Sequence, residues 1–365
     1  MRKILQIPTG LYGTGEQQIA RDIGLNRDRD RLDVHYVVCT DHVDCYEPQL
    51  FAAGCPVHHL PLHARKPAYY YELFKALRAL MREEAFDAVH AHCMFQSGIV
   101  MCAAKTAGVP IRITHSHNTS KVRHPFSGIY DAVMRRLILA NATELVGCGH
   151  AAGEYLFGKK AFRKRGKVIL NGIDVDRFCF REEARRAKRA ELLLDGRFVI
   201  GNVARLGPAK NQAFLIRLMP EILKRRPEAL LLLVGEGTER SGLEQLIHEL
   251  RLEKNVLLTG SVSDVESCLC AMDVFALPSL FEGIPLTVLE AQANGLPCLI
   301  SENVPEETVL TDLVRTIPLN RPADWIHGLC TAERPRGGQY AEELRVKGAD
   351  HHSMLNGIYA LYGRD

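Results

Sequence analysis

Short runs of apolar residues alternate with longer stretches of helical periodicity along most of this 365-residue chain. Such alternation is typical of parallel sheets covered by helices. In the first half, it predicts strands at residues 3–7, 34–39, 57–60, 88–91, 111–115, 145–148 and 168–170. In the second half, it predicts strands at residues 198–204, 230–234, 256–258, 274–276, 298–301 and 314–317. Amphipathic helices are expected at residues 70–82, 212–225, 243–250 and 351–362.

The segment from Asn171 to Phe178 is rich in turn residues, and a charged run follows it as far as Arg189. This is the best candidate for a domain boundary, and the length suits two domains of ordinary size. We therefore predict an α/β protein of two Rossmann-like domains that face each other across a cleft. Ligands of such sheets bind beyond the carboxyl ends of the strands.

The composition, 47% hydrophobic and 24% charged, is that of a soluble globular protein. No apolar run approaches the roughly 20 residues that span a bilayer, and the first apolar stretch is too short for a secretory signal. The eleven cysteines form no Cys-x-x-Cys pair. Scattered through apolar segments, they predict free buried thiols and a cytoplasmic location.

The net charge of +3 is modest, but the positive charge is clustered. Six of the nine residues from Lys159 to Lys167 are basic, and further basic residues lie among apolar ones between Lys121 and Arg136. Basic and apolar residues together suit the anionic surface of an inner membrane leaflet, with a solvated loop and helix face as the alternative. No nucleic-acid-binding motif accompanies the charge, so nucleic acid is not an expected partner.

Two carboxylates with seven residues between them, Glu282 and Glu290, are the most informative motif. Proline near the start and Gly295 after the end predict a helix from about residue 285 to 294, with Glu282 in the preceding loop. A helix N-terminus attracts phosphate, so the two acids could hold hydroxyl groups on either side of a bound phosphate. The alternative is that both acids simply stabilise the helix dipole. The backbone N–H groups expected there belong to Gly283, Ile284, Leu286 and Thr287.

Arg205 and Lys210 share the loop after the first strand of the second half. Two cations at the carboxyl end of a strand can neutralise a diphosphate, although exposed loop cations are the alternative. Gly235 and Gly237 follow another strand, and Val262 lies in the loop after the next. Glycine there lets a backbone approach a planar base, although each loop could be only a tight turn.

A third glycine-rich loop, Gly10 to Glu16, follows the first strand. Its glycines, Gly15 among them, would let backbone N–H groups approach phosphate or sugar. A structural turn is the alternative.

Histidines occur in two pairs, His90 with His92 and His115 with His117, each with one residue between them. We expect the members of a pair to face opposite sides of the strand, so that only one of His115 and His117 reaches a ligand. Carboxylate ligands and a second shell for a metal are not evident. The two Asp-x-Asp matches, at residues 28–30 and 174–176, do not end buried strands, so no metal site is predicted.

The segment FEGIPLTVLEAQANGLPCLIS, residues 281–301, closely resembles the Glu-x7-Glu signature of retaining GT-B glycosyltransferases, above all family four and its members that assemble bacterial capsular polysaccharide and exopolysaccharide. The loop with Arg205 and Lys210 is similar to the family's Gly-Arg-Leu…Lys-Asn segment, with Ala204 in place of glycine. The first loop departs from the family's Gly-Gly-x-Glu, because Thr14 replaces the second glycine.

The resemblance implies transfer of a sugar, with retention of configuration, from a nucleotide-diphosphate donor to a carbohydrate acceptor, here expected to be lipid-linked. Because neither Asp-x-Asp match ends a buried strand, we expect metal-independent transfer, with Arg205, Lys210 and the helix N–H groups in place of a divalent ion. A UDP-sugar is the expected donor, with ADP or GDP as other bases, and no cofactor is implied. Residues 1–170 with the helix at 351–365 would bind the acceptor, and residues 171–350 the donor. A GT-B epimerase and a non-catalytic nucleotide-sugar-binding protein remain as alternatives.

The resemblance also implies roles for individual residues. Glu282 would hold the transferring sugar and stabilise positive charge at its anomeric carbon, His117 (or His115) would contact the same sugar, and Glu290 would bind the ribose. The diphosphate would lie against Arg205, Lys210, Gly15, Leu286 and Thr287. The sugar would also contact Gly283, Ile284 and Pro285, and the base would lie between the loops of Gly235, Gly237 and Val262.

Overall fold

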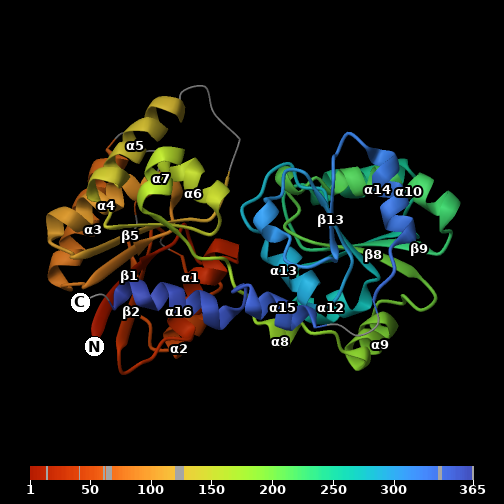
Figure 1. Ribbon diagram of the computed structural model, residues 1–365, viewed down its shortest axis with the longest axis horizontal. Helices are drawn as coiled ribbons and strands as arrows, with labels where there is room; N and C mark the ends of the chain where they lie inside the picture. Colours follow the sequence, from red (N-terminus) through yellow and green to blue (C-terminus); the bar gives the residue numbers. More distant parts are fainter. Residues whose placement is uncertain are drawn as a thin grey trace. The chain divides into compact units, whose positions relative to one another are not determined.

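The computed structural model describes residues 1–13, 15–40, 42–60, 62, 68–119, 127–335 and 339–363. Thr14, residues 121–126 of the second basic stretch, and residues 336–338 lie outside this part. The chain folds into two compact units, one of Met1–Asn171 with Met354–Asp365, the other of Gly172–Ser353 (Figure 1).

The first unit is built on a seven-stranded parallel sheet with the order β3-β2-β1-β4-β5-β6-β7. Its strands are β1 (Arg2–Ile7), β2 (Leu32–Val38), β3 (Val57–His59), β4 (Ala88–Ala91), β5 (Ile111–Ser116), β6 (Glu144–Gly147) and β7 (Gly166–Val168). The strand order reverses between β1 and β4. Loops that leave neighbouring strands in opposite directions open a crevice at such a point.

Helices cover both faces of this sheet (Figure 1). They are α1 (Gly15–Leu25), α2 (Glu47–Ala52), α3 (Tyr69–Glu83), the 3₁₀ turn η1 (Met94–Gln96), α4 (Ser97–Ala107), α5 (Ser127–Asn141), α6 (His150–Phe157) and α7 (Lys159–Arg165). One buried cluster joins β1 and β4 to α3, α4, α5 and α6. A second joins α1 and β2 to the last helix, α16 (His351–Tyr362), through Met354, Ile358 and Tyr362.

The second unit contains a six-stranded parallel sheet with the order β10-β9-β8-β11-β12-β13. Its strands are β8 (Phe198–Val203), β9 (Ala229–Val234), β10 (Val256–Gly260), β11 (Val274–Leu277), β12 (Cys298–Ser301) and β13 (Val314–Ile317). Its helices are α8 (Val175–Phe178), α9 (Glu182–Glu191), η2 (Pro208–Lys210), α10 (Gln212–Arg225), α11 (Arg240–Glu249), α12 (Val265–Ala271), α13 (Leu286–Ala293), η3 (Glu306–Thr308), α14 (Pro322–Thr331) and α15 (Tyr340–Val346). The strand order reverses between β8 and β11, where this unit has its own crevice position.

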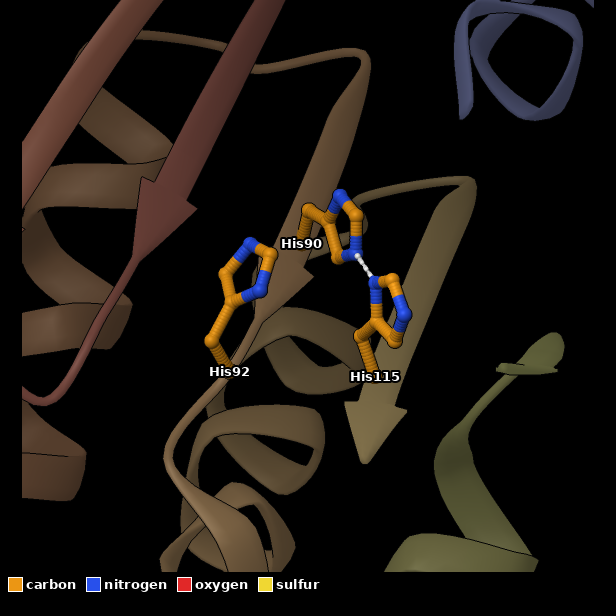
Figure 2. Close-up of side chains that lie close together, drawn as sticks. All are labelled: His90, His92 and His115. Atoms are coloured by element: carbon orange, nitrogen blue, oxygen red, sulfur yellow. Dashed lines mark hydrogen bonds between the residues drawn. The ribbon is translucent and has the colours of Figure 1, made fainter. Parts of the chain in front are cut away.

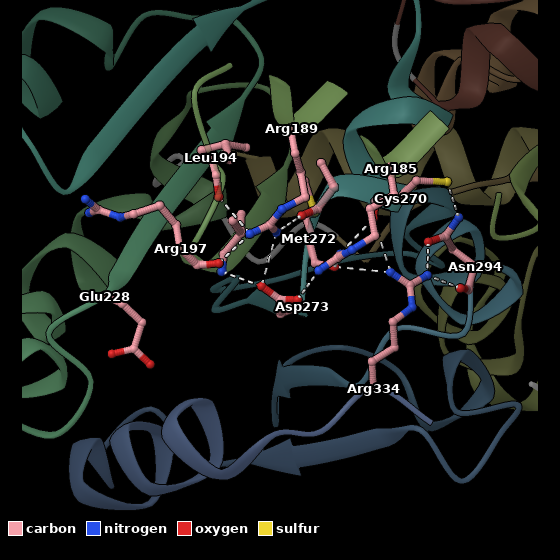
Figure 3. A network of polar contacts seen from close by, with 12 residues as sticks. Arg185, Arg189, Leu194, Arg197, Glu228, Cys270, Met272, Asp273, Asn294 and Arg334 are labelled. Atoms are coloured by element: carbon pink, nitrogen blue, oxygen red, sulfur yellow. Dashed lines mark hydrogen bonds and ion pairs between the residues drawn. The ribbon is translucent and has the colours of Figure 1, made fainter. Parts of the chain in front are cut away.

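The charged run after residue 178 forms helix α9, which a polar network fastens to the second sheet (Figure 3). Arg185 donates to Oδ1 of Asp273 at 2.6 Å, and Arg189 lies 3.5 Å from Oδ2. The same carboxylate accepts from the backbone N–H of Val199 at 2.7 Å. Arg185 and Arg189 are therefore structural ion-pair partners of Asp273, which the hydrophobic pattern alone did not predict.

Every strand expected from the apolar runs is present. β4, β12 and β13 have the expected bounds, whereas the last strand of the first unit, β7, begins at Gly166 and ends at Val168. The basic stretch from Lys159 forms α7, whose Phe162 is buried while its five basic residues are exposed. All eleven cysteines are free thiols. No helix in the described part of the chain has the length and apolarity to cross a membrane.

Candidate active site

The loops that follow β8 and β11 meet at the strand-order reversal of the second sheet. Nζ of Lys210 lies 2.6 Å from Oε1 of Glu282, and the hydroxyl of Ser279 donates to the same oxygen at 2.6 Å. The backbone N–H of Leu280 donates to the carbonyl of Ala209 at 2.8 Å. Glu282 is thus a buried carboxylate held by a cation and a hydroxyl, on two loops that are themselves joined.

The loop after β8 is shaped by its own backbone and amide groups. Asn211 adopts a left-handed conformation with φ of 54°, which turns the chain from η2 into α10, and its amide donates to the carbonyl of Pro278 at 3.2 Å. Gln212 donates to the carbonyl of Arg205 at 3.1 Å. The guanidinium of Arg205 is exposed, and in the part of the chain that the structure describes it has no ion-pair partner. This loop therefore presents a cation that is available to an anion.

Helix α13 begins at Leu286, directly after the loop that carries Glu282. Its N-cap is Pro285, which has no side-chain acceptor, and no side chain among the residues that the structure describes caps the first N–H groups. The N–H groups of Leu286 and Thr287 lie at this end, where the helix dipole favours negative charge. The expected helix is confirmed within one residue at each end. Gly283 and Ile284 are buried in the turn just before it.

Glu290 lies in the second turn of α13 and is 5% exposed. Burial raises the pKa of its carboxyl from 4.5 to about 7; the positive charge of Arg177 opposes this rise and the negative charge of Glu266 adds to it. Arg177 itself pairs with Glu266 at 2.9 Å. Sequence reasoning placed Arg177 in a linker and missed this contact, because its partner is 89 positions away.

Two glycine loops lie at the same edge of this sheet. Gly235 has φ of 138°, and a Cβ on it would lie 2.1 Å from the carbonyl oxygen of Ala204. A Cβ on Gly237 would lie 2.1 Å from the carbonyl oxygen of Leu206. Gly235 also donates to the carbonyl of Gly260 at 2.9 Å, which brings the loop of Val262 alongside. These glycines are required for the close approach of three loop backbones.

In the first unit, Gly15 is the first residue of α1, just after the loop that follows β1. Glu16, next to it, turns back to that loop: Oε2 accepts from the hydroxyl of Thr9 at 2.7 Å and Oε1 from its N–H at 3.1 Å. Burial raises the pKa of Glu16 to about 7 although both hydrogen bonds lower it. Glu16 therefore holds the loop that precedes Gly15.

His90, His92, His115 and His117, hereafter the histidine cluster, lie together at the carboxyl ends of β4 and β5. The expectation that paired histidines face opposite sides is wrong: ring centroids are 4.2 Å apart for His90 and His92, and 4.0 Å for His115 and His117. The reason is the strand period of two, which places residues i and i+2 on the same face. Both His115 and His117 are buried on that face.

The nitrogen atoms of three of these rings are near enough to be compared with a metal site. Ligand atoms of His90, His92 and His115 lie within 4.8 Å of one another (Figure 2). Burial lowers the pKa of His90 to about 3, with a contribution from His117, and lowers that of His117 to about 3 as well. Neutral imidazoles suit a transition metal. Here, however, both nitrogen atoms of His90 and both of His92 already pair with neighbouring rings and side chains, so neither ring has a nitrogen left for a metal ion.

Two family descriptions match the chain, one in each unit. Residues 14–172 match the glycosyl transferase 4-like domain, and residues 184–325 match the glycosyl transferases group 1. A putative glycosyltransferase of Bacillus subtilis strain 168, EpsF, is 31% identical over an alignment of 371 positions, which covers 99% of this chain and 96% of that protein. The chain belongs to this glycosyltransferase family. The expected membership is therefore confirmed.

Two other glycosyltransferases are similar in sequence to part of this chain. The Escherichia coli UDP-Gal:alpha-D-GlcNAc-diphosphoundecaprenol alpha-1,3-galactosyltransferase is 32% identical over 62% of this chain and 60% of its own. The Staphylococcus aureus capsular polysaccharide biosynthesis glycosyltransferase CapH is 24% identical over 72% of this chain and 70% of its own.

Solved structures agree in fold. Anabaena Alr3699/HepE in complex with UDP-glucose matches 99% of both chains with a TM-score of 0.81 at 21% identity. WaaG, a glycosyltransferase involved in lipopolysaccharide biosynthesis, matches all of both chains with a TM-score of 0.77 at 16% identity. The predicted α/β class, GT-B with two Rossmann-like units, is confirmed.

Proposed function

We propose that this glycosyltransferase moves a sugar from a UDP-sugar to a lipid-linked carbohydrate acceptor in cell-surface polysaccharide biosynthesis, with retention of configuration and without a metal ion. The observation that carries the proposal is the arrangement around α13: Glu282 held by Lys210 before the helix, uncapped N–H groups at its start, and buried Glu290 within it. This set offers an anion site between two hydroxyl-binding carboxylates.

The chemistry follows from charge development. As the bond between the sugar and the diphosphate breaks, negative charge grows on the leaving phosphate and positive charge on the anomeric carbon. The negative charge on the phosphate would be stabilised, in place of a divalent cation, by Lys210, Arg205 and the N–H groups of Leu286 and Thr287. Lys210 has three protons, so it can bind a phosphate oxygen while it keeps Glu282 in position.

Glu282 would accept hydroxyls of the transferring sugar and stabilise the positive charge at its anomeric carbon. Glu290 would accept the ribose hydroxyls, and the loops of Gly235, Gly237 and Val262 would lie against the base. By analogy with the family, His117 would contact the transferring sugar and Gly15 the phosphate. With no protein nucleophile in this arrangement, the leaving phosphate would accept the acceptor's proton.

A lipid-linked acceptor is supported by the surface of the first unit. On α5, Ile129 and Val133 are 76% and 50% exposed, one helical turn apart, and Arg136 is exposed on the next turn. Helix α7, with its exposed basic residues, follows closely in the same unit. Apolar and basic side chains together favour an anionic bilayer surface. We therefore propose a cytoplasmic enzyme bound peripherally at the inner leaflet.

The decisive assay is transfer from labelled UDP-, GDP- and ADP-sugars to lipid extracts in the presence of EDTA, followed by NMR of the product's anomeric proton. We expect transfer from one UDP-sugar with the anomeric configuration of the donor. An inverted product would contradict retention, a requirement for divalent metal would contradict the phosphate site, and epimerisation without an acceptor would favour an epimerase.

The membrane contact is tested separately by sedimentation with anionic vesicles. A variant with three exposed lysines of α7 changed to glutamine should bind the vesicles more weakly, whereas an equal charge change on the second unit should not. Equal binding by both variants would contradict the membrane proposal and leave the donor site intact. The test changes are at Lys159, Lys160 and Lys164; the control changes are at Arg217, Lys254 and Arg315.

A further inference from the structure

A continuous hydrogen-bonded chain connects the last helix to the histidine cluster. The hydroxyl of Tyr362 on α16 lies 2.7 Å from Nδ1 of His90 and accepts from Nε2 of Gln6 at 2.7 Å. Gln6 comes from β1, and all three side chains are fully buried. Residues 356 positions apart in the sequence therefore share one interior polar group.

The chain continues in two arms. In one, Nε2 of His90 lies 3.3 Å from Nδ1 of His115, as Figure 2 shows. In the other, Oε1 of Gln6 lies 2.9 Å from Nε2 of His92, whose Nδ1 is 2.8 Å from Nε2 of His117. Each contact between two imidazoles requires one ring to donate and the other to accept.

The orientation of one amide decides every proton in the first arm. Because Gln6 donates to the hydroxyl of Tyr362, that hydroxyl must give its own proton to Nδ1 of His90. His90 then carries its proton on Nε2 and donates to Nδ1 of His115. His115 in turn carries its proton on Nε2, a buried nitrogen that has no partner in the described part of the chain.

The second arm ends in the opposite way. Oε1 of Gln6 can only accept, so His92 donates from Nε2 and its Nδ1 accepts from Nε2 of His117. Nδ1 of His117 is then an unprotonated acceptor, and this buried atom also has no partner among the described residues. The two arms thus end in one donor and one acceptor, on side chains of the same strand end.

We propose that Tyr362 is a positioning residue: with Gln6, it fixes the tautomers of the histidine cluster so that His115 presents an N–H donor and His117 a bare acceptor. A hydroxyl group both donates and accepts, so one that contacted both atoms would satisfy both ends. The assignment of that hydroxyl to a sugar rests on the proposed function, whereas the tautomers do not. Helix α16 would in this way determine the polarity of a site built on β4 and β5.

The tautomers can be measured directly by long-range ¹H–¹⁵N correlation NMR on the full chain labelled at histidine, because protonated and bare ring nitrogens resonate in separate regions. We expect all four histidines of the cluster to be protonated on Nε2, with assignments from single His→Gln variants. Protonation on Nδ1 throughout would mean that the Gln6 amide has the reverse orientation. A metal ion retained after dialysis against EDTA would show that the histidines bind a metal instead of forming the hydrogen-bonded chain. Either result would overturn the proposal.

Two tyrosines of the same helix provide a matched pair of variants. Tyr362→Phe removes the donor to His90, so we expect mixed tautomers at His90 and His115 while His117 keeps its proton on Nε2. Tyr359→Phe removes a hydroxyl that donates to the carbonyl of Ile23 at 2.9 Å, outside the chain, and should leave the spectrum unchanged. Unchanged tautomers in Tyr362→Phe, with the fold retained, would refute the positioning role.

Activity gives a second readout that depends on the proposed function. We expect kcat/KM for sugar transfer to fall about tenfold in Tyr362→Phe, since its role is indirect, and to stay unchanged in Tyr359→Phe. If no transfer is detected in the wild type, the proposed function fails while the NMR result still decides the tautomers. If tautomers mix but kcat/KM is unchanged, the chain has no role in positioning for catalysis.

Discussion

Glu290→Gln should make the second unit more stable and its donor binding weaker. The carboxyl is buried in α13, and its pKa in the folded protein is about 7 rather than 4.5. Below pH 4.5 the carboxyl is protonated in both the folded and the unfolded state, so it does not change the free energy of unfolding. As the pH rises from 4.5 to 7, the carboxyl ionises in the unfolded state but stays largely protonated in the folded state. The free energy of unfolding therefore falls over this range.

The size of this loss follows from the two pKa values. A difference of about 2.5 in pKa corresponds to about 3 kcal/mol of destabilisation above pH 7. Glutamine has nearly the same shape and no charge, so it removes the dependence on pH. The stability of the variant relative to the wild type should therefore rise by about 2.5 kcal/mol between pH 5 and pH 8.

Trp325 makes the measurement specific to the second unit. It is the only tryptophan in the chain and is fully buried in α14. Urea unfolding followed by its fluorescence at several pH values gives the free energy of unfolding of this unit. Glu183→Gln, an exposed change on α9 in the same unit, serves as the control and should show no such trend.

Donor binding should change in the opposite direction, because the ribose hydroxyls need an ionised acceptor. We expect Glu290→Gln to bind UDP roughly 10- to 100-fold more weakly at pH 8, the range for hydrogen bonds to charged groups. A variant whose relative stability does not depend on pH would refute the buried, partly protonated carboxyl. A variant that is stabilised but binds UDP with wild-type affinity would show that Glu290 does not contact the donor.

Three further substitutions test separate parts of the structure. Lys210→Met should weaken UDP binding by about 2 kcal/mol in calorimetry, and it leaves the Glu282 carboxylate without its cation. Unchanged affinity for UDP would show that Lys210 is not part of the phosphate site. Asp273→Asn should lower the free energy of unfolding by about 3 kcal/mol in the Trp325 assay, because it leaves partly buried arginines of α9 without their carboxylate. A loss below about 1 kcal/mol would show that the ion pairs of Asp273 are solvated. Gly237→Ala should reduce affinity for the nucleotide, since the loop must move away from the carbonyl of Leu206, and wild-type affinity would show that the loop does not contact the base.

The strands could be predicted because they are short apolar runs, several of which, such as β8, β9, β11 and β12, are buried along their whole length. Helix α13 could be predicted because proline and glycine bound it in the sequence. Pairwise contacts could not be predicted in the same way. Ser279 contacts Glu282 only because a turn brings its hydroxyl back, and Arg177 reaches Glu266 across 89 positions. Neither side chain is part of a periodic pattern.

The histidine cluster shows a different limit. Its four members are evident in the sequence, but the prediction that paired histidines face opposite sides is wrong, because a strand places residues i and i+2 on one face. The positions of their protons depend on Gln6 and Tyr362. These two residues lie near opposite ends of the chain. No local pattern relates them, and only the docking of α16 on the first unit brings them together.

The most direct test of the central claim is calorimetric titration of the wild type with UDP, GDP and ADP in EDTA, repeated with Arg205→Gln, whose exposed guanidinium makes no ion pair among the described residues. We expect UDP to bind selectively without metal and the variant to lose about tenfold in affinity. Preference for another base, or binding only when Mg²⁺ is restored, would contradict it.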